Sequence, residues 1–517
     1  MATRTSLTPS VRWIFMPMTN LAALSIPDLQ QYAQGAVAAP FGLVLDDGSV
    51  LQSLEVVRRV PGKRLVCRGL LNGQAIYAKL FIGGQAGKYA ARDKRGARWL
   101  AQARLATPTL LLESGVASQG CEALLYGAIP ARNAEQVWQD LDEEGRHALA
   151  LRLVEEVARH HRAGLLQTDL YLKNFLVDAQ AVYTLDGDGI RQLRVFGRQR
   201  QQWDNLARLI SKFDVDAVAA WLPSLLRQYV AVIGGTASDI DIMQQLIARH
   251  WQRDMRQYAS KVQRSCTDVA VEEKPWHYLA INRAQDSPGV RQALATPDGL
   301  LDATSAVRLK SGNTCTVAAV EIDQRKMVIK RYNIKNFWHG LGRAWRPSRA
   351  VVSWSNAFRL QLKGIATPAA VAVLERRWLG LRREAYLLTE FMIARDAAEF
   401  YADLTIDREV KERVAQRIAR LFFQLFCLQL EHGDFKATNI LIRDQYPLLI
   451  DLDSMRQHAC KKRFERRHAR DLQRFFKNWQ GDAATSQLLA AAFRAVYADG
   501  RVLDQAGIVF NQSEKDE

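Results

Sequence analysis

One pattern of residues occurs twice in this chain, and the two copies are 265 positions apart, at Asp169 and at Asp434. In each copy the Asp is followed five positions later by an Asn and then, after twelve more, by a second Asp. Self-similarity with conserved internal spacing marks a repeated structural unit. The chain is therefore predicted to contain two copies of one fold, each of roughly 220 residues. The repeated residues are Asp169, Asn174 and Asp186 in the first copy and Asp434, Asn439 and Asp451 in the second.

Two further markers precede each triplet in the same order. A lysine ends an apolar, strand-like run, at Lys79 in the first copy and at Lys330 in the second. A Thr-Pro pair follows, at positions 107–108 and 367–368. The agreement of several markers in one order makes a chance match implausible, and we interpret the chain as a tandem duplication.

Local patterns place these residues on secondary structure. Apolar residues at helical spacing predict helices over Leu149–His161 and Val414–Leu430, just before each Asp…Asn loop. The short apolar runs Asn174–Val177 and Tyr183–Asp186 are typical of a hairpin around the loop. Strands followed by helices indicate an α+β fold class.

A strand lysine, an Asp-x4-Asn loop and a later Asp are the groups that phosphoryl transfer needs, since that reaction depends on positioning and on stabilising negative charge. The lysine neutralises phosphates, the loop Asp accepts the proton of the attacking hydroxyl, and the Asn and second Asp hold Mg²⁺. The second copy then has Lys330 for phosphates, Asp434 as base and Asn439 with Asp451 for metal, and Lys436 is placed to reach the γ-phosphate. The first copy has Lys79, Asp169, Asn174 and Asp186 in the same roles.

Both copies resemble the lipopolysaccharide kinase family (Kdo/heptose kinases), a branch of the protein-kinase-like fold. His432-Gly433-Asp434 is the form of the catalytic loop found in that family, and the resemblance covers about residues 50–215 and 305–480. It implies two tandem two-lobed domains that use ATP and Mg²⁺ to phosphorylate an inner-core sugar at the cytoplasmic face of the inner membrane. The predicted segments are an N-terminal extension over 1–45, a first kinase-like domain over 46–260, a linker over 261–302 and a second domain over 303–510.

Each copy departs from the kinase pattern in a different place. Neither has a GxGxxG loop, and the corresponding turns are Pro61–Arg64 and Lys310–Thr314, where Gly312 is the candidate phosphate contact. Counting back from the Thr-Pro pair places Asp93 as the helix acid that pairs with the strand lysine, whereas Ser353–Asn356 offers no acid in the second copy. The first copy in turn has Gln167 in place of the loop histidine. We favour the second copy as the better catalyst.

Three supporting residues are expected to act on the catalytic loops and not on substrate. Asp204 and Asp471, downstream of the first and second triplets, are interpreted as braces for the loops, and His432 as a group that orients the backbone of the second loop. Asp453 is ambiguous, because a carboxylate two positions after Asp451 can assist a metal or cap a turn.

The chain has 71 Lys and Arg against 54 Asp and Glu, a formal net charge of +17, which favours anionic partners. The expected partners are lipopolysaccharide core glycolipid or another anionic glycolipid and the anionic surface of the inner membrane, and no nucleic acid is expected. Two segments carry this expectation. Lys335–Trp354 interleaves tryptophans with arginines and suits either a membrane interface or a packed helix. Arg456–Arg470 suits either an anionic acceptor or a solvated basic face.

The six cysteines have no CxxC spacing, which argues against zinc and disulfides and fits the reducing cytoplasm. No apolar run reaches about 18 residues, so no membrane-spanning helix is predicted. Two other functions stay open: a kinase for another small molecule or protein, and a pseudokinase scaffold in envelope assembly. The intact second triplet argues against the scaffold, and the missing Gly-rich loop and helix acid favour it.

Overall fold

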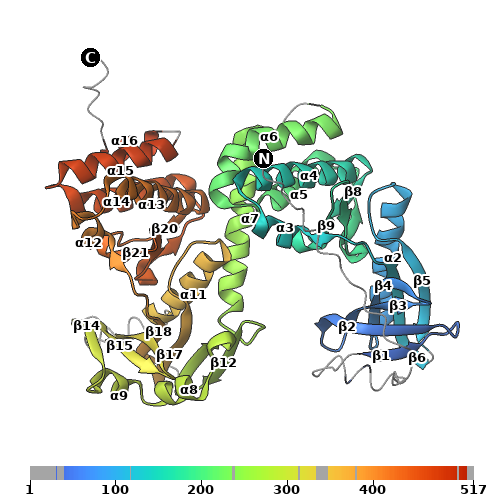
Figure 1. Cartoon of the computed structure of the whole chain (residues 1–517), viewed down its shortest axis with the longest axis horizontal. Helices are drawn as coiled ribbons and strands as arrows, with labels where there is room; N and C mark the ends of the chain where they lie inside the picture. Colours follow the sequence, from blue (N-terminus) through green and yellow to red (C-terminus); the bar gives the residue numbers. More distant parts are fainter. Residues whose placement is uncertain are drawn as a thin grey trace, which may run out of the picture. The chain divides into compact units, whose positions relative to one another are not determined.

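The computed structural model describes residues 40–508 apart from 117, 236–238, 313–314, 334–346, 379–380 and 498–499, together with Leu29 and Gln31. The chain forms two compact units (Figure 1). The first unit comprises residues up to Phe213 together with Trp221–Leu246, and the second comprises Asp214–Ala220 together with residues from Ile247 onward.

The first unit begins with a six-stranded antiparallel sheet in the order β1-β2-β3-β4-β6-β5. Alternate residues of β4 point into its core, where Ile76, Ala78 and Leu80 are fully buried. One helix, α2, connects β4 to β5 and packs against β4 and β6. The elements are β1 (Phe41–Val44), β2 (Val50–Val60), β3 (Arg64–Leu71), β4 (Gln74–Ile82), α2 (Ala86–Gln102), β5 (Leu110–Val116) and β6 (Ser118–Gly127).

A mainly helical part follows, and it carries the first Asp…Asn loop. Asp142 caps α4 by accepting a hydrogen bond from the Gly145 backbone N–H at 2.8 Å. The predicted hairpin is present, because β9 and β10 pair antiparallel. The elements are β7 (Arg132–Asn133), α3 (Ala134–Asp140), α4 (Glu143–Arg162), β8 (Leu165–Gln167), η1 (Leu172–Asn174), β9 (Phe175–Val177), β10 (Val182–Thr184), η2 (Gly187–Gly189), β11 (Ile190–Gln192) and α5 (Arg198–Ile210). Helices α6 (Val215–Ile233) and α7 (Ile240–Lys261) are divided between the units, since the start of α6 and the residues of α7 from Ile247 belong to the second unit.

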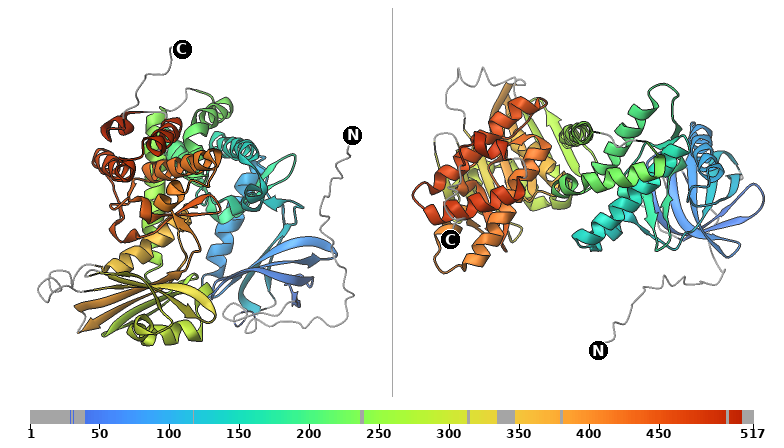
Figure 2. Two further views of the ribbon diagram at one scale, coloured as in Figure 1. Left: turned by 60° about the vertical axis from the view of Figure 1, so that its left-hand side comes forward. Right: turned by 90° about the horizontal axis from the view of Figure 1, so that it is seen from above.

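The second unit has a seven-stranded antiparallel sheet in the order β12-β13-β17-β18-β16-β15-β14. Helices α8 and α9 lie on one side of this sheet and α11 on the other (Figures 1 and 2). Val290, Leu294 and Leu301 of α8 and α9 join the core beneath the sheet. The elements are β12 (Val269–Lys274), β13 (His277–Asn282), η3 (Arg283–Gln285), α8 (Pro288–Ala295), α9 (Pro297–Asp302), β14 (Val307–Ser311), β15 (Cys315–Ile322), β16 (Arg325–Tyr332), α11 (Arg349–Leu362), β17 (Ala370–Trp378) and β18 (Leu381–Glu390).

The helical part of the second unit holds the second Asp…Asn loop. Helix α13 contains the predicted helix except for its last two residues, because it ends at Leu428, where Gln429 takes a left-handed conformation (φ 54°) and Leu430 begins β20. The elements are β19 (Arg395–Asp396), α12 (Ala397–Ala402), α13 (Arg408–Leu428), β20 (Leu430–Glu431), η4 (Ala437–Asn439), β21 (Ile440–Arg443), β22 (Tyr446–Leu449), η5 (Leu452–Ser454), β23 (Arg456–Gln457), α14 (Lys461–Phe476), η6 (Lys477–Trp479), α15 (Ala483–Val496) and α16 (Arg501–Gln505).

The same order of elements occurs in both units. Strands β2-β3-β4-β6-β5 of the first sheet have the connectivity of β14-β15-β16-β18-β17 in the second, and α2 and α11 occupy the same place in the chain order. The loop elements β8-η1-β9-β10-η2-β11 correspond to β20-η4-β21-β22-η5-β23. The sheets differ at their edges, where the first adds β1 and the second adds β12 and β13.

Two predicted boundaries need correction. The N-terminal extension was expected to run to residue 45, but β1 begins at Phe41 and pairs with β2. The segment 261–302 was expected to be a linker, but it forms β12, β13, α8 and α9, and β13 pairs with β17. Its prolines suggested a linker because proline breaks regular structure, yet Pro288 and Pro297 stand at the first turns of α8 and α9, where proline is favoured.

Among the helices of the described part of the chain, none is long and apolar enough to cross a membrane. The six cysteines are free thiols.

Candidate functional site

In the first unit the strand lysine lies between two carboxylates. Lys79 Nζ, on β4, is 2.6 Å from Asp93 Oδ2 of α2 and 2.8 Å from Asp186 Oδ1 at the start of η2. Asp93 is fully buried, and Tyr126 Oη donates a hydrogen bond to it. Burial opposes the charge of Lys79, but the two carboxylates outweigh this effect and raise the pKa of Lys79. The ammonium group is therefore held in its charged form.

The first Asp…Asn loop is tied together by side-chain amides. Asn174 Nδ2 donates to the backbone oxygen of Asp169 at 2.9 Å. Gln167, at the histidine position, donates through Nε2 to Leu185 O at 3.1 Å, and Asn205 Nδ2 donates to Gln167 O at 2.9 Å. Gln167 thus connects the loop to the end of the hairpin without an imidazole.

In the second unit Lys330 on β16 also meets two carboxylates, but both come from η5 and its cap. Lys330 Nζ is 2.6 Å from Asp451 Oδ1 and 3.2 Å from Asp453 Oδ2. Asp453, with a side chain 2% exposed, also accepts from Arg349 Nη2 of α11 at 2.8 Å. Tyr332 lies beneath both cations, with its ring centroid 4.9 Å from Lys330 Nζ and 5.3 Å from Arg349 Cζ. The ambiguous Asp453 is therefore an ion-pair partner.

The second loop is braced by a buried carboxylate, as its sequence suggested. The backbone N–H groups of His432 and Gly433 donate to Asp471 at 2.8 and 3.1 Å. Burial raises the pKa of Asp471 to about 7. Burial also lowers the pKa of His432, which favours a neutral ring that donates from Nε2 to Ile450 O at 3.1 Å. The interpretation of Asp471 as a brace and of His432 as an orienting group is confirmed.

This bracing leaves the second loop's Asp at the surface with two cations beside it. Asp434, with a side chain 32% exposed, is 3.1 Å from Lys436 Nζ and 3.3 Å from Arg474 Nη1. Asn439 Nδ2 donates to Asp434 O at 2.8 Å, which repeats the Asn174–Asp169 bond of the first unit. The next residue, Phe435, is 1% exposed and anchors the loop in the core. An exposed carboxylate on a fixed loop can accept a proton from a hydroxyl.

Helices α2 and α11, which lie beside the two lysines, differ in whether they carry an acid at the position counted back from the Thr-Pro pair, as the sequence predicted. Ser353 stands where Asp93 stands in the first unit, and its Oγ is 3.1 Å from Tyr332 Oη. No acid of α11 therefore reaches Lys330, and Arg349 of α11 binds Asp453 instead. The helix carries a cation to the cluster in the second unit and an anion in the first.

A second difference concerns how closely each helix approaches its loop. Gly96 of α2 lies directly on the Gly187 backbone: a Cβ on Gly96 would overlap Gly187, and a Cβ on Gly187 would overlap the backbone of Asp93 and Ala97 in the same helix. Asn356, eleven positions before the Thr-Pro pair as Gly96 is, fills the same place in the second unit. Its Nδ2 donates to Leu452 O at 2.9 Å and to Met455 O at 3.1 Å. A side-chain amide thus replaces a direct backbone contact.

The turns expected to cover phosphates are short and open. Gly312 follows β14 and its N–H donates to Cys315 O at 3.2 Å, while residues 313–314 lie outside the described ones. A Cβ on Gly312 would meet nothing closer than that oxygen, 3.7 Å away. In the first unit Gly62 (φ 65°) forms the turn between β2 and β3. Both turns connect the two strands that precede the lysine strand.

The donor atoms of both clusters fit a magnesium ion that is completed by phosphates. Asp451 supplies a carboxylate and Asn439 an amide oxygen, and Asp186 and Asn174 supply the same pair in the first unit. Each Asn uses its Nδ2 on the loop backbone, which leaves its oxygen as an acceptor. The described residues contain no group of three or more His, Cys, Asp or Glu that could hold a metal. Mg²⁺ is commonly held by one or two carboxylates together with substrate phosphates, so the donors suit it.

The structure describes part of Lys335–Trp354 and all of Arg456–Arg470, the two basic segments for which the sequence left two roles open. Trp354 is fully buried and its Nε1 donates to Val262 O at 3.0 Å, so this residue packs in the core, whereas residues 334–346 of that stretch lie outside the described part. Helix α14 buries Phe464, Leu472 and Phe475 and exposes its basic side.

Sequence reasoning did not single out Arg349 or Arg474 as site residues. Both lie in or just beyond the basic segments that it noted, but the partners, Asp453 and Asp434, are 104 and 40 positions away. No spacing rule connects residues so far apart. The basic character of the two segments was the available sequence signal for these arginines.

A strand lysine, a loop Asp with its Asn and a second Asp beside the lysine form the set of groups that phosphoryl transfer uses. Residues 302–497 match the model of the lipopolysaccharide kinase (Kdo/WaaP) family. The resemblance inferred from the catalytic-loop motif is therefore confirmed over this range, which lies within the second unit, and the match supports a phosphotransferase. A comparison with the curated proteins finds no match.

Proposed function

We propose that the second unit is an ATP- and Mg²⁺-dependent kinase that phosphorylates a sugar hydroxyl of the lipopolysaccharide inner core at the cytoplasmic face of the inner membrane. One observation carries the proposal: residues separated by more than 100 positions, Lys330 and Asp451, meet at 2.6 Å, and Asp451 follows the loop of Asp434 and Asn439. The family match over residues 302–497 supports the acceptor class.

The residues of the second unit would divide the work as follows. Bound Mg·ATP supplies the phosphoryl group and the cation that neutralises it. Lys330, held charged by its carboxylate partners, would bind phosphate oxygens. Asp451 and the oxygen of Asn439 would hold the metal. Asp434 would accept the hydroxyl proton, and Lys436, 3.1 Å from it, would face the transferred group.

The first unit is proposed to have the weaker activity. It pairs Lys79 with a buried helix acid, but it has Gln167 and Tyr171 where the second unit has His432 and Lys436. A lysine adds positive charge beside the base, and the tyrosine does not.

A scaffold function is the second candidate, and a specific observation favours it. Lys330 is engaged by Asp451 and Asp453, and α11 contributes Arg349 in place of an acid, so the usual lysine–acid pair is missing in the second unit. In this reading the basic surface of α14 would bind envelope-assembly partners. A kinase that acts on another small molecule or protein would share the same clusters.

The experiment that tests the proposal measures Mg²⁺-dependent phosphate transfer from ATP to purified core glycolipid by the full chain. Asp434→Asn is expected to lower the transfer rate by about 10²- to 10⁴-fold, the contribution of a positioned general base. Asp169→Asn is the corresponding change in the first unit and should keep most of the activity. Asp444→Asn is the matched control, because Asp444 is an exposed aspartate (φ 50°) in the β21–β22 turn of the same unit.

Each outcome separates the candidates. Transfer that is lost with Asp169→Asn and kept with Asp434→Asn would assign catalysis to the first unit. Wild-type protein that binds ATP and transfers phosphate to a different acceptor would keep the kinase and reject the glycolipid. Protein that neither binds ATP nor transfers phosphate would support the scaffold.

A further inference from the structure

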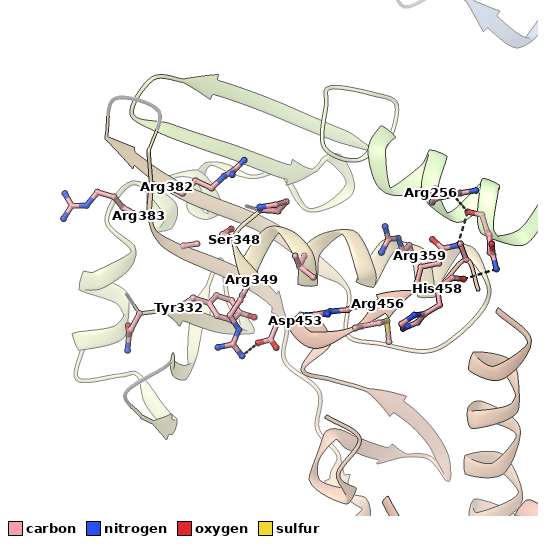
Figure 3. Close-up of a pocket in the computed structure, with 18 residues that line it drawn as sticks. Arg256, Tyr332, Ser348, Arg349, Arg359, Arg382, Arg383, Asp453, Arg456 and His458 are labelled. Atoms are coloured by element: carbon pink, nitrogen blue, oxygen red, sulfur yellow. Dashed lines mark hydrogen bonds and ion pairs between the residues drawn. The ribbon is translucent and has the colours of Figure 1, made fainter. Parts of the chain in front are cut away.

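One cavity of the second unit lies next to the proposed catalytic cluster and shares Tyr332, Arg349 and Asp453 with the ion-pair network of Lys330. It has a volume of about 660 Å³ and lies beside the first half of α11 (Figure 3). Its walls come from α7, the end of β16, α11, β18 and the segment that follows Asp453. Lys330, Asp434, Asn439 and Asp451 are not among its lining residues. A volume in this range suits a small organic ligand.

The charge of this cavity is strongly one-sided. Six arginines line it, and among its lining residues Asp453 is the single carboxylate. Figure 3 shows Arg382 and Arg383 at one end of the pocket and Arg256, Arg359 and His458 at the other, with Arg349 and Asp453 between them. We call this set the arginine pocket, and its arginines are Arg256, Arg349, Arg359, Arg382, Arg383 and Arg456.

Several of these arginines are not neutralised by the protein. Arg349 binds Asp453 and Arg382 binds Glu375 at 3.0 Å. Among the described residues, no carboxylate lies within ion-pairing distance of Arg256, Arg359 or Arg456. Arg256 and Arg456 are exposed to solvent, whereas Arg359 is only partly exposed, and a cation withdrawn from water without a counter-ion is unfavourable.

Arg359 makes the strongest case, because it is the least exposed of these three arginines. Its guanidinium donates to Asn356 Oδ1 at 2.7 Å, and its buried Nε has no hydrogen-bond partner among the described residues. Burial lowers the pKa of Arg359, and no nearby carboxylate offsets this effect. The planar guanidinium group keeps its charge in proteins and matches phosphate oxygens in geometry.

We propose that the arginine pocket is a second anion-binding site, adjacent to the nucleotide cleft, and that it binds a phosphate-bearing ligand carrying at least two negative charges. Arginines bind phosphate by paired, charge-assisted hydrogen bonds, and their arrangement on several walls suits a group that is approached from more than one side. The same chemistry is present in a soluble phosphate ester and in the phosphorylated headgroup of a lipid, and the test below distinguishes these sources.

The experiment titrates the full-length protein with inorganic pyrophosphate by isothermal calorimetry. Arg359→Gln and Arg383→Gln are expected to lower the affinity for pyrophosphate about tenfold each, the loss of one charge-assisted contact. Arg383 is well exposed, so its variant keeps the fold even if the buried Arg359→Gln is unstable. Arg408→Gln, an exposed arginine of α13 outside the pocket, is the matched control and should leave the affinity within twofold.

Lys436→Gln separates this site from the nucleotide cleft, because Lys436 is proposed to face the transferred phosphate and does not line the pocket. It should also keep the affinity for pyrophosphate. The second arm measures flotation with vesicles of phosphatidylcholine and phosphatidic acid in equal parts, since phosphatidic acid has a phosphomonoester headgroup that can carry two negative charges. Vesicle binding that the two pocket variants weaken and pyrophosphate displaces would identify a lipid headgroup, whereas pyrophosphate binding without vesicle competition would identify a soluble ester.

The proposal is overturned if pyrophosphate does not bind, if Arg359→Gln and Arg383→Gln bind it like the wild type, or if Lys436→Gln abolishes the binding. None of these readouts depends on phosphate transfer, so failure of the kinase proposal leaves this test intact.

Discussion

Replacement of Gly433 by alanine should destabilise the second unit and disable its loop. Gly433 stands between His432 and Asp434 and has φ 82°, in the left-handed region. A Cβ added there would lie 2.9 Å from the backbone oxygen of Ser454 and 3.2 Å from its Cβ. Because the nearest atom belongs to the backbone, a side-chain rotation cannot relieve the contact.

The magnitude follows from two contributions. A left-handed conformation costs an L-residue roughly 1–2 kcal/mol, and overpacking a filled site costs roughly 1–3 kcal/mol. The free energy of unfolding of the second unit should therefore fall by about 2–5 kcal/mol. Any shift that relieves the contact moves the backbone bonds from His432 and Gly433 to Asp471, and Asp434 moves with them.

Hydrogen exchange read by mass spectrometry across a urea series measures this loss, since peptides of the second unit report it separately from those of the first. Gly481→Ala is the matched control. Gly481 lies in the same unit, its φ is not positive, and a Cβ there would meet nothing within 4 Å, so its change should stay within about 0.5 kcal/mol. Equal unfolding free energies for Gly433→Ala and Gly481→Ala would refute the reasoning.

Two further predictions concern a buried carboxyl and a close helix contact. The pKa of Asp471 is about 7 in the folded protein, whereas an aspartate carboxyl in an unfolded chain has a pKa of about 3.9. Protonated Asp471 therefore stabilises the folded state below about pH 4, and this stabilisation is lost as the pH rises to about 7. Urea unfolding across this range should show a steeper loss of stability for the wild type than for Asp471→Asn, and parallel curves would contradict the assignment. In the first unit, Gly96→Ala would force a Cβ onto Gly187 and should cost roughly 1–3 kcal/mol, seen as faster hydrogen exchange in α2 with no change in the second unit.

Repeated spacing along the chain was enough to locate the clusters. Asp434 and Asn439 lie on one short loop, and Asp451 follows the hairpin that closes it, so their sequence distances are fixed by local structure. Lys330 could be added because it ends a strand that the same repeat marks. Such local elements are predictable since their geometry depends on few other residues.

The partners of these residues could not be predicted in the same way. Asp453 binds Arg349 across 104 positions, and nothing in the sequence indicates that a helix would carry a cation where the first unit has Asp93. The segment 261–302 was wrongly interpreted as a linker, because Pro288 and Pro297 break structure in some positions and begin helices in others. The first case depends on long-range pairing, and the second depends on where a proline stands within an element.

Helices α2 and α11 contact their loops in different ways, and this difference limits which residues of one unit can be grafted into the other. An acid grafted at Ser353, to copy Asp93, would still belong to a helix whose distance from its loop is set by Asn356. Restoring the first unit's contact would require glycine at 356 and a smaller residue at Leu452 as well, since Gly96 and Gly187 form one fitted pair. A chimera made by single substitutions would therefore gain the carboxylate without the helix–loop contact that positions it. Function could be transferred between the two units only by exchanging the helix and the loop together.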